Sequence, residues 1–107
     1  MAASDIEILR FTRDMEQSIA VANREIIHPL IPDITRESVL PLAISVARLR
    51  ALYLQAAFKM SAENRGDTPN QQEIDELRRH REMYEEARLA FDALIHAIER
   101  GYVDLAD

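Results

Sequence analysis

Scarce helix breakers constrain this chain more than any other feature. Only two glycines and four prolines occur in 107 residues, at Pro29, Pro32, Pro41, Gly66, Pro69 and Gly101. A multi-stranded sheet needs many more turn-forming residues than this. The breakers therefore predict a single all-α domain, residues 1–107, with three long helices over about residues 5–27, 38–64 and 69–100.

The first predicted helix has a clear start, face and end. Ser4 and Glu7 form a capping box at its start. Apolar residues then recur at three- and four-residue spacing, at Ile8, Phe11, Met15, Ile19, Ala22 and Ile26. Pro29 disfavours helical geometry at the preceding residue, so we expect the helix to end near Ile27.

The start of the second helix depends on where Pro41 lies in it. The candidate first residues or caps are Asp33, Thr35 and Ser38. The two earlier starts place Pro41 inside the helix, at a cost of about 3 kcal/mol. Ser38 as N-cap places Pro41 in the first turn, where no amide hydrogen bond is lost, so we expect that start. Gly66 predicts an end near Asn64.

The third helix is expected to begin with Thr68 as N-cap, Pro69 at the first helical position and Gln71 completing a capping box. Gly101 is the expected left-handed terminator after Arg100. We expect residues 104–107 to fray.

The apolar content exceeds what three helices in one copy bury. The second helix is apolar on most sides and leaves a narrow polar stripe of Ser45, Arg48, Gln55 and Lys59. Residues 70–82 offer few apolar side chains, whereas residues 83–98 offer many. Monomers seldom expose such a surface. We therefore predict an antiparallel helical bundle completed by homodimerisation.

Two sets of residues are candidates for binding chemistry. Glu25 and His28 have the Glu-x-x-His spacing that bundle metal sites use in pairs, although His28 also suits a contact with the last carbonyls of its helix. Arg50 lies in an apolar row of the second helix. We expect a buried ion pair there, with Glu25, Asp92 or an acid of a second subunit, and the alternative is contact with a bound anion.

The start of the third helix carries charges of alternating sign. Its candidate partner-binding surface consists of Glu73, Glu76, Arg78, Arg79, Arg81 and Glu82. Charges at this spacing are typical of an exposed helix stabilised by weak ion pairs, and they also suit docking on a protein.

Charge and composition exclude several function classes. The net charge is −6, and the only segment with a positive balance is the central one, which we expect to be buried, so the charges argue against nucleic acid. No basic amphipathic stretch indicates a membrane surface, and the absence of cysteine excludes a thiol nucleophile or a cysteine zinc site. No signal peptide is evident, so we expect a cytoplasmic protein. No catalytic motif is found.

These features predict a non-enzymatic helical protein without a cofactor that acts through protein–protein interaction, as a regulator, adaptor or assembly factor. The partners are itself, in a homodimer, and an unidentified protein. The alternative is a ligand- or metal-binding bundle with an intersubunit site that uses Glu25, His28 and Arg50.

No family is identified from the sequence. The run from Arg81-Glu82-Met83 through Leu94-Ile95 to Gly101-Tyr102-Val103 resembles small helical antiactivators that bind quorum-sensing regulators of plasmid conjugation. The resemblance covers a short part of the chain and uses common helix residues, so no functional residue is carried over.

Overall fold

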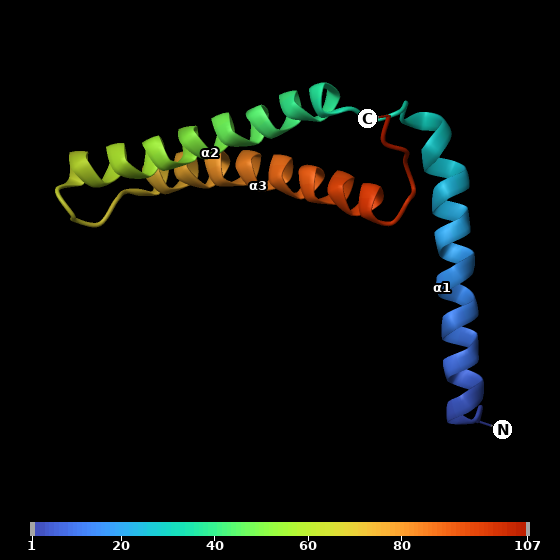
Figure 1. The fold of residues 1–107 in the computed structure, drawn as a ribbon. Coiled ribbons are helices and arrows are strands. Elements are labelled where there is room, and N and C mark those ends of the chain that lie inside the picture. Colours follow the sequence, from blue (N-terminus) through green and yellow to red (C-terminus); the bar gives the residue numbers. More distant parts are fainter. Residues whose placement is uncertain (1, 107) are drawn as a thin grey trace. The chain divides into compact units, whose positions relative to one another are not determined.

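The computed structural model describes residues 2–106 and consists mainly of helices (Figure 1). Helix α1 spans Asp5–Ile27, the short 3-10 helix η1 spans His28–Leu30, α2 spans Arg36–Asn64 and α3 spans Gln71–Glu99. Within the described residues, the only β-type pairing is one isolated bridge, between Ile34 and Leu105. The predicted all-α fold of three long helices is confirmed.

The chain divides into two compact units. Residues Arg36–Ile95 form the first, which we call the hairpin unit. The second, the clasp unit, combines the segment up to Thr35 with the segment from His96. Helix α1 and the C-terminal tail, although distant in sequence, therefore belong to one body.

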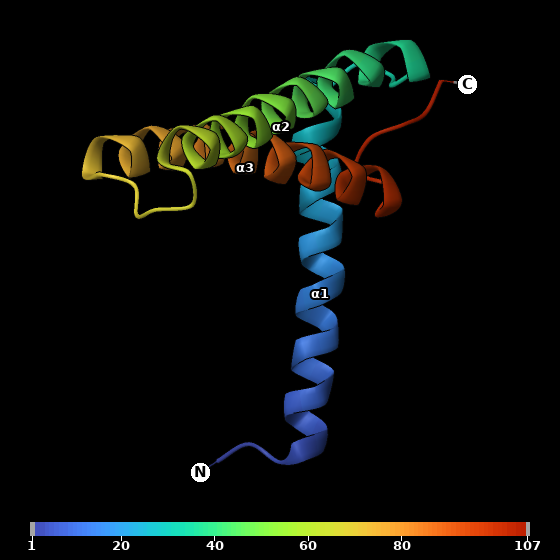
Figure 2. The ribbon, with the colours of Figure 1, turned by 90° about the vertical axis from the view of Figure 1, so that its left-hand side faces the viewer.

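The hairpin unit consists of α2 and most of α3, which run antiparallel and side by side in both views (Figures 1 and 2). Val46 of α2 is buried, and the rings of Tyr53 and Tyr84 stack with their centroids 6.1 Å apart. Gly66, with φ +81°, follows α2, and its amide donates to the Ser61 carbonyl at 3.3 Å. The predicted antiparallel helix packing is thus confirmed for α2 and α3.

Helix α2 begins two residues before the expected start. The expectation of Ser38 as N-cap is wrong, because the helix runs from Arg36 and includes Pro41. The extended backbone of Ile34 sets the limit: its amide donates to the Asp104 carbonyl, and its carbonyl accepts from Ala106, each at 2.9 Å. Because Ile34 is committed to this pairing, the helix starts just beyond it.

Helix α3 begins later than expected, and its cap is a different residue. The Asn70 side chain accepts from the Glu73 amide at 2.8 Å, and the Glu73 carboxylate accepts from the Asn70 amide at 3.0 Å. The prediction of Thr68 as N-cap is therefore wrong, since Asn70 supplies the reciprocal pair of bonds. Glu73 also accepts from the Asn64 side chain at 2.7 Å, which ties the new helix to the end of α2.

The C-terminal tail is ordered by contacts within the clasp unit. Gly101, with φ +76°, ends α3, and the Tyr102 amide returns to the Ala97 carbonyl at 2.9 Å. Val103 is only 3% exposed. The expectation of fraying is wrong for residues 104–106, which pair with Ile34 and the end of α1, and Asp107 lies outside the described residues.

Candidate functional site

Helix α1 presents an unburied apolar surface. None of its residues is buried. The six residues of its predicted apolar face, which we call the apolar stripe, are all exposed: Ile8, Phe11, Met15, Ile19, Ala22 and Ile26. Met15 retains 43% of its accessible surface and Phe11 retains 65%. The stripe is therefore a continuous apolar surface on a well-formed helix.

Charges around the stripe are segregated by sign. At about 100° per residue along a helix, all the acidic residues of α1 fall within roughly 80–100° of the centre of the stripe, on one side or the other. They are Asp5, Glu7, Asp14, Glu16 and Glu25. The basic residues Arg10, Arg13 and Arg24 lie on the opposite side of the helix. The stripe thus has an entirely acidic border.

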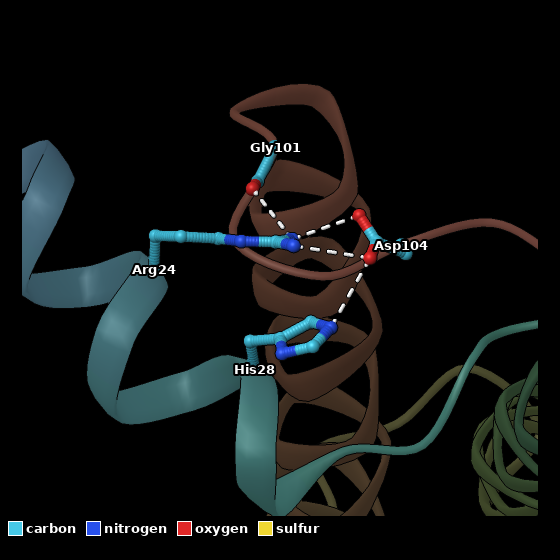
Figure 3. Close-up of polar contacts among 4 residues, drawn as sticks. All are labelled: Arg24, His28, Gly101 and Asp104. Atoms are coloured by element: carbon cyan, nitrogen blue, oxygen red, sulfur yellow. Dashed lines mark hydrogen bonds and ion pairs between the residues drawn. The ribbon is translucent and has the colours of Figure 1, made fainter.

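The C-terminal tail attaches to Arg24, which lies on the opposite side of α1 from the stripe, and to His28 just after the helix (Figure 3). Arg24 donates to both carboxylate oxygens of Asp104, at 2.8 and 3.0 Å, and to the Gly101 carbonyl at 3.2 Å. His28 Nε2 lies 3.1 Å from the second of these oxygens. The hydrogen bonds from Arg24 lower the pKa of the Asp104 carboxyl. We call these contacts among Arg24, His28, Gly101 and Asp104 the clasp. The clasp leaves the apolar stripe uncovered.

The clasp also determines the surroundings of Glu25 and His28, the predicted metal-binding pair. His28 has Asp33 and Asp104 as its possible co-ligands, with ligand atoms within 4.8 Å of one another, and Glu25 is not in this group. A metal ion would have to displace the Arg24 guanidinium, which already holds both oxygens of Asp104. The geometry therefore favours a structural ion pair over a metal centre.

Arg50 lies against an aromatic ring, not in a buried ion pair. Its side chain is exposed, its Nε donates to the Tyr84 hydroxyl at 3.1 Å, and its guanidinium carbon lies 5.2 Å from the ring centroid. It shares a shallow cleft with Arg88, which is already paired with Asp92 at 3.1 Å. Stacking on the ring explains how a cation is accommodated in this apolar row.

The predicted charged surface of α3 divides into two parts. Glu76, Arg78, Arg79, Arg81 and Glu82 are exposed, and we call them the charged face. Arg78 pairs with Asp75 at 3.2 Å on the same helix. Glu73 is instead half-buried and engaged with Asn70 and Asn64, bonds that lower its pKa. Glu73 thus supports the helix start, and the other five remain available for contact.

Helix α2 is long and apolar enough to cross a membrane by length and composition alone. An 18-residue stretch has a mean hydropathy of 1.3. However, Arg48 and Arg50 lie near the middle of this helix, where each would cost about 2.5–3.5 kcal/mol in a bilayer. The two arginines favour packing against protein.

Sequence reasoning missed the clasp residues Arg24 and Asp104. Arg24 and His28 are four residues apart and therefore share a helix side. That spacing, together with an acid three residues after the terminating glycine, is the signal present in the sequence. It does not reveal that the tail returns to α1, because the return depends on the backbone pairing of Ile34.

Comparisons against models of protein families, against curated proteins and against solved structures find no match to this chain.

Proposed function

We propose that this chain is a small non-enzymatic helical protein of the cytoplasm that acts by binding other proteins, as a regulator, adaptor or assembly factor, and that it works as a homodimer. The observation that carries the proposal is the exposure of α1. A capped helix of 23 residues buries none of them and holds a continuous apolar stripe open to contact.

The energetics of an unpacked helix support this reading. Helical stability in proteins comes mainly from packing of an amphipathic face, so α1 gains most from a partner. The stripe has five large apolar side chains that are 43–65% exposed. At roughly 150–200 Å² for each fully covered side chain, it offers on the order of 500 Å², near the upper limit of the largest patch on an ordinary monomer.

The acidic border selects a protein over a membrane as the occupant. Helices that lie on membranes carry lysine and arginine beside their apolar face, where these residues meet anionic lipids. Here that position is held by carboxylates, which anionic lipids repel. The fitting occupant is an apolar protein surface bordered by basic side chains.

The charged face of α3 is the proposed docking surface for a different protein. Its five side chains, two acidic and three basic, are exposed, and they lie on a helix that packs on α2 through Tyr84. Such a surface contributes specificity and association rate more than raw affinity. It therefore suits a regulator or adaptor that engages its partner reversibly.

Charge reversal on α3 tests this surface. The triple variant Arg78→Glu, Arg79→Glu and Arg81→Glu should reduce capture of the partner from native lysate at least about 10-fold. The matched control is Arg10→Glu, Arg13→Glu and Arg100→Glu, which makes the same change in net charge at exposed positions elsewhere. Circular dichroism verifies that both variants keep their helices. Equal capture by the two variants would refute the surface.

A further inference from the structure

Helix α2 carries a second apolar face that its packing on α3 leaves open. Six residues follow a heptad-like spacing of four, three, four, three and four, and we call them the outer seam: Leu40, Ile44, Ala47, Ala51, Leu54 and Phe58. All six are exposed, and Phe58 retains 77% of its accessible surface. At about 100° per residue, they lie well away from the line of Val46 and Tyr53, which is turned towards α3.

The border of the outer seam is basic. Within about 100° of its centre on either side stand four basic side chains and one acidic one. They are Arg36, Arg48, Arg50, Lys59 and Glu37. The apolar stripe of α1 has the reverse border, with five carboxylates and no cation. The chain thus carries two exposed apolar faces with complementary borders.

We propose that two copies of this chain form a reciprocal dimer in which the apolar stripe of each α1 packs antiparallel on the outer seam of the other copy's α2. This inference rests on the proposed homodimer and specifies its interface, since it names the two faces that meet and takes a second copy as their occupant. The contact occurs twice, related by a two-fold axis.

The two faces match in length and in side-chain size. Each covers 19 residues, so its first and last members are 18 residue steps, or about 27 Å at 1.5 Å per residue, apart. With the first residue of the stripe opposite the last of the seam, five members of each face lie opposite one another, and in three of these pairs a small residue faces a large one. The pairs are Ile19 with Ala47, Met15 with Ala51, and Ala22 with Ile44. Alternation of this kind lets facing helices interdigitate.

The same register brings opposite charges together. In an antiparallel pair, each border of one helix faces the corresponding border of the other. Three acid–base pairs then lie two residues, or about 3 Å, from direct opposition: Asp5 with Lys59, Asp14 with Arg50, and Glu16 with Arg48. Because these long charged side chains can span an offset of this size, the electrostatics are compatible with the alignment set by the apolar packing. A parallel pairing or an α1–α1 pairing loses this match, and the latter places carboxylates against carboxylates.

The surface available suffices for a stable dimer. Each face contributes on the order of 500 Å² of apolar side chain. Two reciprocal contacts therefore bury on the order of 2,000 Å² in total, within the range of specific, stable interfaces. A single contact between one stripe and one seam would bury only about half of this area, which is below that range.

The connector favours exchange between copies. It contains Pro29 and Pro32, and Ile34 is held by its pairing with the tail while the clasp holds the end of α1. Short, stiff hinges favour the exchange of identical elements between protomers. The stripe and the seam are each exposed, and a second copy supplies a surface for both.

A mixing experiment with charge-reversed chains tests the dimer directly. One variant carries Asp5→Lys and Glu16→Lys, and the other carries Arg48→Glu and Lys59→Glu. Light scattering on size-exclusion peaks should give a mass of about 25 kDa for the wild type, twice 12.3 kDa. Each variant alone should dissociate at least about 100-fold more readily, because both contacts then oppose like charges. Mixed in equal amounts, they should recover the dimer, since one contact is reversed in both partners and the other is wild type.

The control variant Arg10→Glu with Arg13→Glu changes charge on the opposite side of α1 and should leave the mass unchanged. A monomeric wild type, variants that remain dimeric alone, or a mixture that stays monomeric would each overturn the proposal. Because the readout is the mass of purified protein, its failure is distinguishable from failure of partner capture through the charged face of α3.

Discussion

The hairpin unit and α1 use helices of similar length in opposite ways. In the hairpin unit, α2 and α3 pack on each other through the stacked tyrosines, the buried Val46 and the hydrogen bond from Asn64 to Glu73. Helix α1 has a capping box and a clasp at its two ends but no buried residue between them. In α1, local signals are thus sufficient to define where the helix begins and ends, whereas its packing requires another surface.

The mutation with the largest expected effect should destabilise the hairpin unit and leave α1 little changed. Tyr84→Ala removes the stack on Tyr53 and the contact with Arg50, so it should lower the free energy of unfolding of the hairpin unit by about 2–3 kcal/mol. Residue-resolved hydrogen exchange should show faster exchange in α2 and α3, with little change in α1. The control Tyr84→Phe removes only the hydroxyl that accepts from Arg50 and should cost about 1 kcal/mol or less. Equal losses in α1 and the hairpin would contradict the division into two units.

A smaller effect tests which residue starts α3. Asn70→Ala removes the side chain that caps the helix and should cost about 1 kcal/mol in chemical denaturation. Thr68→Ala, at the cap position that the sequence indicates, should cost clearly less. The reverse order of the two losses would restore the sequence-based start and remove Glu73 from its role in joining α2 to α3.

The caps show how far the sequence alone determines this fold. Ser4 with Glu7 and the two glycines specify local geometry, and the predicted end of α1 and the turns after α2 and α3 agree with the structure. The errors at Ser38 and Thr68 have one cause. Several residues near each helix start can act as caps, and a contact beyond the local window decides between them: the pairing of Ile34 with the tail in one case and the bond from Asn64 in the other.

The candidate site was predictable to a similar extent. The apolar stripe of α1 follows from its spacing, but the acidic border becomes informative only beside the basic border of α2. Arg50 was singled out because it interrupts an apolar row, yet its neighbour is Tyr84, an aromatic ring on another helix. Sequence periodicity gives the face on which a residue lies but not what occupies that face.

The smallest expected effect concerns the clasp and follows from the carboxyl of Asp104. Its pKa is lowered below the ordinary value of 3.8, mainly by the hydrogen bonds from Arg24. A carboxyl with a lowered pKa in the folded state stabilises that state above its ordinary pKa, and this contribution is lost as the pH falls through the lowered value. The clasp should therefore hold at pH 5 and open as the pH falls well below 4.

The Glu73 carboxyl titrates in the same direction, because its pKa is also lowered, so a global unfolding curve would mix the two events. Amide chemical shifts of Ile34 and Ala106, followed by NMR during acid titration, report the clasp alone. In Asp104→Asn the same amides should show no such transition, and an unchanged transition in that variant would mean that the tail is held by its backbone pairing without the ion pair.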